Sequence, residues 1–133
     1  MSDANAEKVS PFACDMSAIE PSERSQHMAT ISELFRAVEE VRELANGYAF
    51  RFANEPDVLL LAAQFIALEK LCCPFFGFTL EVEPEGGALW LSLTGRDGVK
   101  PFIMAEIGDY LIKPASRPVK DNFRPVKDNL ESL

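Results

Sequence analysis

The chain has no long apolar run and no secretory leader pattern, and both absences bear on where it works. Its longest apolar run, Val58 to Ala63, is far shorter than the roughly 20 residues that cross a bilayer. The first residues show no basic start followed by an apolar stretch, so we expect no signal peptide. The two absences predict a cytoplasmic protein without a membrane partner.

Positive charge is also in the minority. The 133 residues carry 13 Lys and Arg against 21 Asp and Glu, which gives a formal net charge of −8 at pH 7. Binding to DNA, to RNA or to an anionic lipid surface requires a basic face. We therefore expect no nucleic-acid partner. A small enzyme, a metal or ligand binder and an interaction module remain as classes of function.

Familiar catalytic motifs are absent as well. The chain contains no phosphate-binding glycine loop, no G-x-S-x-G and no H-E-x-x-H. The single histidine, His27, is the one candidate base for a cysteine or serine nucleophile. Its position at the border of a helical apolar stripe favours a partly buried or surface histidine. A thiol-dependent enzyme is therefore the least favoured of the three classes.

What is present is the pattern of one α+β domain. Apolar residues at helical spacing predict three helices, over residues 21–37, 54–71 and 99–112. Pro21 and Pro56 suit the first turns of the first two helices, and Asn54 is the predicted N-cap of the second.

Alternating apolar residues predict the strands. One hairpin is expected over residues 41–52 with an Asn46-Gly47 turn, and a second is formed by residues 78–83 and 88–94. A further short strand is predicted at residues 12–16. The order β-α-β-β-α-β-β-α predicts an antiparallel sheet with the helices packed on one face.

The ends of the chain differ from this domain in composition. Residues 1–10 are small, polar and acidic and are expected to form a flexible tail, so the domain spans residues 11–113. Residues 114–133 contain the sequence RPVKDN twice, at 117–122 and 124–129. Two copies rich in proline and charge predict a disordered tail rather than a solenoid.

The three cysteines give the clearest chemical signal. An odd number without a secretory signal argues against a disulfide framework and for reduced thiols. Cys72 and Cys73 are adjacent, and Glu69 precedes them by three and four residues, so the three side chains share one flank of the helix end. Cys14 lies far away in the sequence. It could join the pair only if its segment docks beside that helix end.

The position of the pair predicts metal binding rather than nucleophilic catalysis. The negative end of the helix dipole and the Glu69 carboxylate should both raise the pKa of the thiols. A bound cation reverses this effect, because it stabilises thiolates and is attracted by the same field. Mercuric, cuprous and zinc ions suit sulfur ligands best. Simple packing at a tight helix end is the alternative, since cysteine is among the most buried residue types.

The same stretch resembles a known family. The pattern runs through the central helix and the strands that follow it: Ala67-Leu68-Glu69-x-x-Cys72-Cys73-Pro74-Phe75-Phe76-x-Phe78-x-Leu80, then Trp90-Leu91 and Leu93-Thr94-Gly95. It is similar to small bacterial E-x-x-C-C-P-F proteins, some of them associated with mercury or heavy-metal resistance genes. The likeness covers residues 10–112, including a cysteine before the first helix that Cys14 matches. It implies no established activity.

Two functions from different classes follow. The first is a small metal-binding protein, an accessory of metal resistance with a partner protein of that system, whose ligands are Cys72, Cys73 and Cys14, with Glu69 as an orienting carboxylate. The second is a homodimeric interaction module in which the cysteines only pack. Its motivation is Trp90, which alternates with leucines and is expected on an exposed outer face, together with the aromatic cluster Phe75, Phe76 and Phe78.

Overall fold

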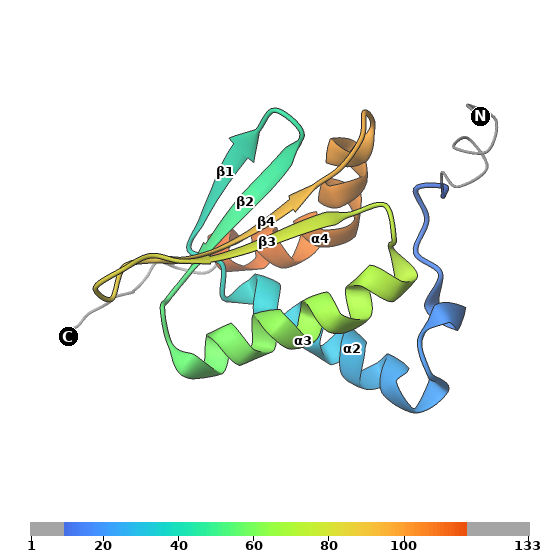
Figure 1. The fold of residues 1–133 in the computed structure, drawn as a ribbon, viewed down its shortest axis with the longest axis horizontal. Coiled ribbons are helices and arrows are strands. Elements are labelled where there is room, and N and C mark those ends of the chain that lie inside the picture. Colours follow the sequence, from blue (N-terminus) through green and yellow to red (C-terminus); the bar gives the residue numbers. More distant parts are fainter. Residues whose placement is uncertain (1–9, 117–133) are drawn as a thin grey trace.

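The computed structural model describes residues 10–116, which form a four-stranded antiparallel sheet and three α-helices (Figure 1). A short 3₁₀ turn, η1 (Met16–Ala18), leads into the first helix, α2 (Pro21–Arg36). The other elements follow in the order β1 (Glu40–Leu44), β2 (Gly47–Phe52), α3 (Pro56–Cys72), β3 (Gly77–Val82), β4 (Leu89–Thr94) and α4 (Val99–Ser116). The α+β class and both antiparallel hairpins are confirmed.

The predicted strand at residues 12–16 is wrong, so the order is α-β-β-α-β-β-α. The segment pairs with the end of a helix instead of a sheet edge, because the backbone N–H of Asp15 donates to the carbonyl oxygen of Cys72 at 2.9 Å. The Asp15 side chain then accepts from the N–H of Ser17 and caps η1. The predicted tails at 1–10 and 114–133 lie almost wholly outside the described residues, and α4 continues to Ser116 instead of ending at residue 112.

Two local details also differ from the expectation. The first hairpin turns at Ala45 and Asn46, whereas Gly47 is the first residue of β2 and pairs with Thr94 of β4. A Cβ at Gly47 would lie 1.9 Å from the carbonyl oxygen of Leu93, so glycine is needed there for close approach of two strands. Asn54 does not cap α3; its side chain donates to the Gly87 carbonyl at 2.7 Å.

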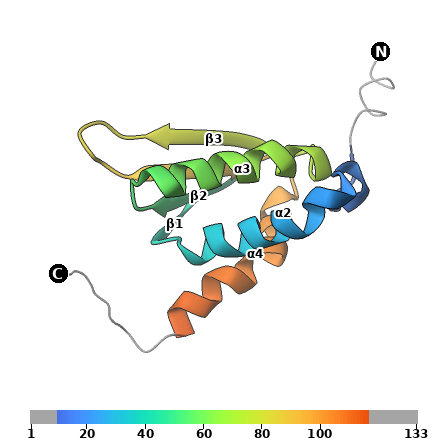
Figure 2. The ribbon, with the colours of Figure 1, turned by 90° about the horizontal axis from the view of Figure 1, so that it is seen from below.

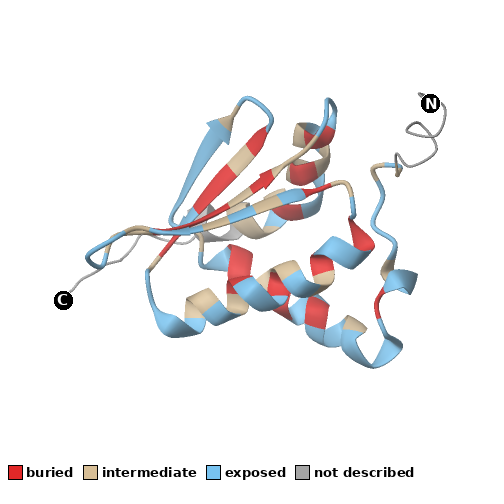
Figure 3. Cartoon of the chain, viewed as in Figure 1, coloured by how far each residue is buried: buried red, intermediate tan, exposed pale blue. Residues whose placement is uncertain are grey.

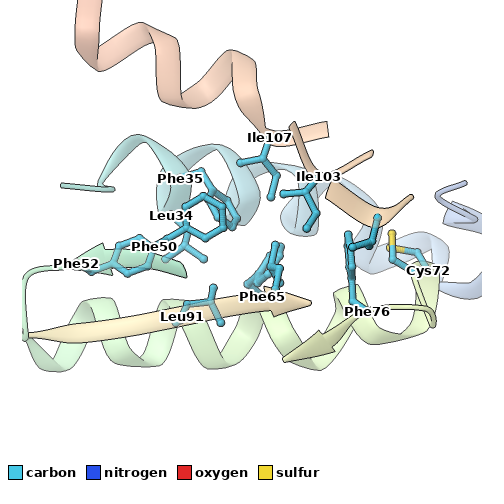
Figure 4. Packing of buried hydrophobic residues seen from close by; sticks show 14 of the residues in the cluster. Leu34, Phe35, Phe50, Phe52, Phe65, Cys72, Phe76, Leu91, Ile103 and Ile107 are labelled. Carbon is cyan, nitrogen blue, oxygen red and sulfur yellow. The ribbon is translucent and has the colours of Figure 1, made fainter. Parts of the chain in front are cut away.

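The core lies between one face of the sheet and the helices, as predicted. The strand order is β1-β2-β4-β3, and the central strands β2 and β4 carry most of the buried positions (Figure 3). Figure 4 shows aromatic and aliphatic side chains from both layers packed together, with Phe35 of α2 edge-on to Phe50 of β2 and Phe65 of α3. Figure 2 shows α2 between α3 and α4. Among residues 10–116, none of the helices combines the length and the apolar composition that a membrane span requires.

The opposite sheet face holds Trp90, and its predicted exposure is wrong. Trp90 is only 7% exposed, and the guanidinium of Arg42 lies over its ring at 4.2 Å from the centroid. The pairing register places Arg51 and Glu81 beside it on the neighbouring strands. Trp90 is therefore covered within its own chain, which removes one of the two reasons for a homodimer; the dimer itself stays a prediction.

Candidate metal centre

The N-terminal segment docks against the end of α3 and brings the third cysteine to the pair. The Asp15–Cys72 backbone hydrogen bond fixes the residue next to Cys14 against the last turn of the helix. The three sulfur atoms of Cys14, Cys72 and Cys73 lie within 4.8 Å of one another, and the Cys72 and Cys73 sulfurs are 3.8 Å apart. Cys72 and Cys73 are buried and Cys14 is exposed, so the cluster reaches the surface through Cys14.

The end of α3 has the broken geometry that two adjacent cysteines need to meet. Neighbouring side chains on a regular helix point about 100° apart. Here α3 ends at Cys72, and Cys73 leaves the helical region with φ −131° and ψ 70° while its N–H still donates to the Glu69 carbonyl. Pro74 follows and cannot continue the helix. The sequence thus ends the helix between the two cysteines and lets both sulfurs turn to one side.

Cys72 also belongs to a second cluster of polar side chains, with His27 and Glu69. His27 of α2 lies 2.8 Å from Glu69 of α3, measured from Nε2 to Oε1, and the Cys72 sulfur donates toward the same oxygen at 3.6 Å. The atoms of His27, Glu69 and Cys72 that could ligate a metal all lie within 4.8 Å of one another, and all three residues are buried. His27 also stacks on Phe65, and its Nδ1 is buried with no hydrogen-bond partner among the described residues.

The thiols differ in proton affinity. Hydrogen bonding from Cys73 lowers the pKa of Cys72 to about 6 against the effect of burial, and His27 adds to the lowering. Burial and the neighbouring Cys72 raise the pKa of Cys14 to about 12. The pKa of Cys73 is raised by its hydrogen bond to Cys72 and by burial. The expectation of a raised pKa for the adjacent pair is therefore right for Cys73 and wrong for Cys72, because the hydrogen bonds from Cys73 and His27 outweigh the negative end of the helix dipole.

Two further groups respond to the same charges. Burial alone would lower the pKa of His27, but the Cys72 sulfur and the Glu69 carboxylate outweigh it and raise the value to about 9. Burial raises the pKa of Glu106 on α4, and the negative charge of Glu69 adds to the effect. The pKa of His27 is thus raised and that of Cys72 lowered, because each group stabilises the charged form of the other.

A cavity of about 280 Å³ adjoins the cluster. Cys14 and Glu69 form part of its wall and thus belong both to the cavity and to the polar groups described above. Most of the remaining wall is apolar and comes from η1 and all three helices: Met16, Met28, Ile31, Phe65 and Ile107.

The structure brings together all four residues predicted for the site: Cys14, Cys72, Cys73 and Glu69. It adds His27, which the sequence placed on a partly buried or surface position but which is only 1% exposed. The spacing of His27 to Ile31 and Leu34 could have indicated that His27 is buried, because these positions share one face of a helix. The partner of that face could not be read from the sequence.

Comparison with protein-family models, with curated proteins and with solved structures gives no match for this chain.

Proposed function

We propose that this protein binds a soft metal ion, mercuric, cuprous or zinc, through the thiolates of Cys14, Cys72 and Cys73. The observation that carries the proposal is the approach of three sulfur atoms to within 4.8 Å of one another from two segments far apart in the sequence. In this proposal the metal is the cargo of the protein and not a resident cofactor. The resemblance of the chain to the E-x-x-C-C-P-F proteins supports a role as an accessory of metal resistance.

The spacing of the sulfurs suits one shared ion. A zinc-type ion about 2.3 Å from each thiolate holds its sulfur ligands roughly 4 Å apart. The Cys72 and Cys73 sulfurs already stand at 3.8 Å. Three thiolates without an oxygen ligand favour soft ions over magnesium or calcium, which take oxygen ligands.

Entry to the site is possible because the thiols are not equally buried. Cys14 is exposed, whereas Cys72 and Cys73 have no exposed surface. An arriving ion meets Cys14 first and then displaces protons from the buried thiols as it binds. Glu69, which accepts from His27 and from Cys72, orients the thiol that it contacts.

A shared Cys72 also makes two ligand sets available. The three cysteines offer an all-sulfur set, and His27, Glu69 and Cys72 offer nitrogen, oxygen and sulfur. Imidazole and carboxylate suit zinc, whereas mercuric and cuprous ions prefer sulfur. We expect the soft ions to use the cysteines and to leave the His27–Glu69 pair intact.

The test is a titration of the reduced full chain with mercuric, cuprous and zinc ions in competition with a small thiol. Binding is followed by the sulfur-to-metal charge-transfer absorption. Wild type should take one ion per chain, Cys14→Ser should bind more weakly, and Cys72→Ser/Cys73→Ser should bind no more tightly than the competing thiol. Two-coordinate binding by the adjacent pair alone would leave Cys14→Ser equal to wild type.

Ser92→Ala is the matched control, because Ser92 lies on the opposite face of the sheet, paired with Ala49 and Thr79. It should bind each ion as wild type does. Circular dichroism verifies that every variant is folded before binding is compared. Equal weak binding by wild type and by the double cysteine variant would refute the proposal.

A further inference from the structure

The thiol cluster does not face open solvent alone, because Cys14 stands in the wall of the 280 Å³ cavity. Besides Cys14 and Glu69, the wall contains the apolar Met28, Ile31 and Ile107 of α2 and α4, and α4 adds Glu106 and Tyr110. An inorganic ion held by three sulfurs has no use for this apolar space. The cavity therefore indicates that the ligand has an apolar part in addition to its metal.

We propose that the ligand of this site is a monoorganometal cation, a thiophilic metal ion that carries one apolar organic group. The inference rests on the proposed function and names the class of its ligand. The metal binds the cysteine sulfurs, and the organic group occupies the cavity beside them. A metal bound to one carbon and one sulfur in a line directs its organic group away from that sulfur, and the cavity is the adjacent apolar space.

The size of the cavity fits such a group. A dry apolar cavity of about 150 Å³ is large enough to bind benzene. The 280 Å³ here leaves room for a phenyl group together with the metal to which it is attached. The wall also includes Phe65, whose ring offers an edge or face to an aromatic group.

The charge around the cavity selects a cation. Its ionisable wall residues are Glu69, Glu106, Cys14 and Tyr110, all of them acids, and no lysine, arginine or histidine lines it. An anionic ligand would find no counter-charge there. A cation that combines with a thiolate becomes neutral, which lowers the cost of moving it into an apolar site.

The binding step is a ligand exchange without a change of oxidation state. The halide or water on the metal leaves as a cysteine sulfur forms its bond to the metal, and the thiol proton, where present, passes to solvent. The bond between the metal and carbon stays intact. No oxidant, reductant or further reactant is needed.

The experiment compares methylmercury, phenylmercury and inorganic mercuric ion on the reduced full chain. Each is measured in competition with β-mercaptoethanol, which supplies a thiol but no cavity. Burial of each additional CH₂-sized group contributes about fourfold to affinity. Relative to β-mercaptoethanol, the protein should therefore prefer phenylmercury over methylmercury by at least about tenfold, since even two such groups suffice.

Filling the cavity should abolish that preference. Met28→Trp places a larger side chain at a cavity-lining residue that is already half exposed, so the fold should tolerate it. Leu60→Trp is the matched control, because Leu60 is 64% exposed on α3 and does not line this cavity. Met28→Trp should reduce the preference for phenylmercury to that of the free thiol, and Leu60→Trp should leave it unchanged. Ile31→Phe serves as a second filling variant if Met28→Trp does not fold.

The outcomes separate this inference from the function on which it rests. Cysteine-dependent binding of inorganic mercuric ion with no preference between the two organomercurials would overturn the inference and leave the metal site standing. A preference for phenylmercury that survives both filling variants would overturn it too. Failure of all three mercury species to bind through the cysteines would overturn both proposals.

Discussion

Replacement of Glu69 by glutamine should lower the pKa of His27 and weaken the fold in acid more than in base. Glutamine keeps the shape and the hydrogen-bonding oxygen but removes the charge that lies 2.8 Å from Nε2 of the imidazole. An opposite charge at such a distance shifts a pKa by about 1–3. We therefore expect the pKa of His27 to fall from about 9 to between about 6 and 8.

The effect on stability has a definite sign. A histidine whose pKa rises from 6.5 in the unfolded chain to about 9 in the fold stabilises the protein fully below pH 6.5, and this contribution disappears as the pH rises through 9. Each tenfold change in proton affinity corresponds to about 1.4 kcal/mol. Glu69→Gln should thus reduce the free energy of unfolding at pH 6 by about 1.4 to 4 kcal/mol through His27, with little of this loss left at pH 9.5.

Cys72 contributes with the opposite sign and makes the comparison sharper. Its pKa falls to about 6 in the fold, so the stability it provides is present above its unfolded value of 9.0 and is lost as the pH falls through 6. The charge of Glu69 opposes this lowering. Its removal therefore favours the Cys72 thiolate, and the variant should recover further relative to wild type as the pH rises.

The assay uses the fact that the chain has one histidine. A single imidazole resonance followed by NMR from pH 5 to 10 gives the pKa of His27 directly, and urea unfolding at pH 6 and pH 9.5 under reducing conditions gives the stabilities. Glu106→Gln is the control, because Glu106 lines the same cavity without a hydrogen bond to His27. A wild-type pKa near 6.5, or a value that Glu69→Gln leaves unchanged, would refute the reasoning.

Three smaller predictions can be checked by urea unfolding and thiol labelling. Phe65→Ala should cost about 3–5 kcal/mol because the ring is fully buried, whereas Leu60→Ala at an exposed position should change stability by less than about 0.5 kcal/mol; equal effects would contradict the packing described. Gly47→Ala should destabilise the protein through its clash with β4, whereas Gly108→Ala on α4, where a Cβ meets nothing within 4 Å, should stabilise it by about 0.5–1 kcal/mol. A thiol reagent should label Cys14 in the native protein, slowly at neutral pH because its raised pKa leaves little thiolate, and should label the other two cysteines only in denaturant; rapid labelling of all three would show that the helix end opens readily.

The hairpins and the three helices could be predicted because their signals are local. Strict alternation at Leu89, Leu91 and Leu93 faces one side of a strand to the core, and the structure buries all three. Local patterns also explain the errors. Asn46-Gly47 is a strong turn signal, but glycine is required at position 47 because β4 packs closely against it. The contact is with Leu93, which is 46 positions further along the chain and cannot be read from the local pattern.

The candidate site likewise contains residues that the local sequence places together and residues that only tertiary packing brings in. The adjacent thiols, the carboxylate one turn before them and the proline that breaks the helix end follow from the sequence of residues 69–74, because they depend on helix geometry alone. The place of Cys14 and His27 was decided by tertiary structure. His27 meets Glu69 across 42 residues through the packing of α2 on α3, and Cys14 reaches the pair through the Asp15–Cys72 hydrogen bond. The low pKa of Cys72 arises from these lateral neighbours, since the field at a thiol depends on every charge and donor around it and not only on those of its own helix.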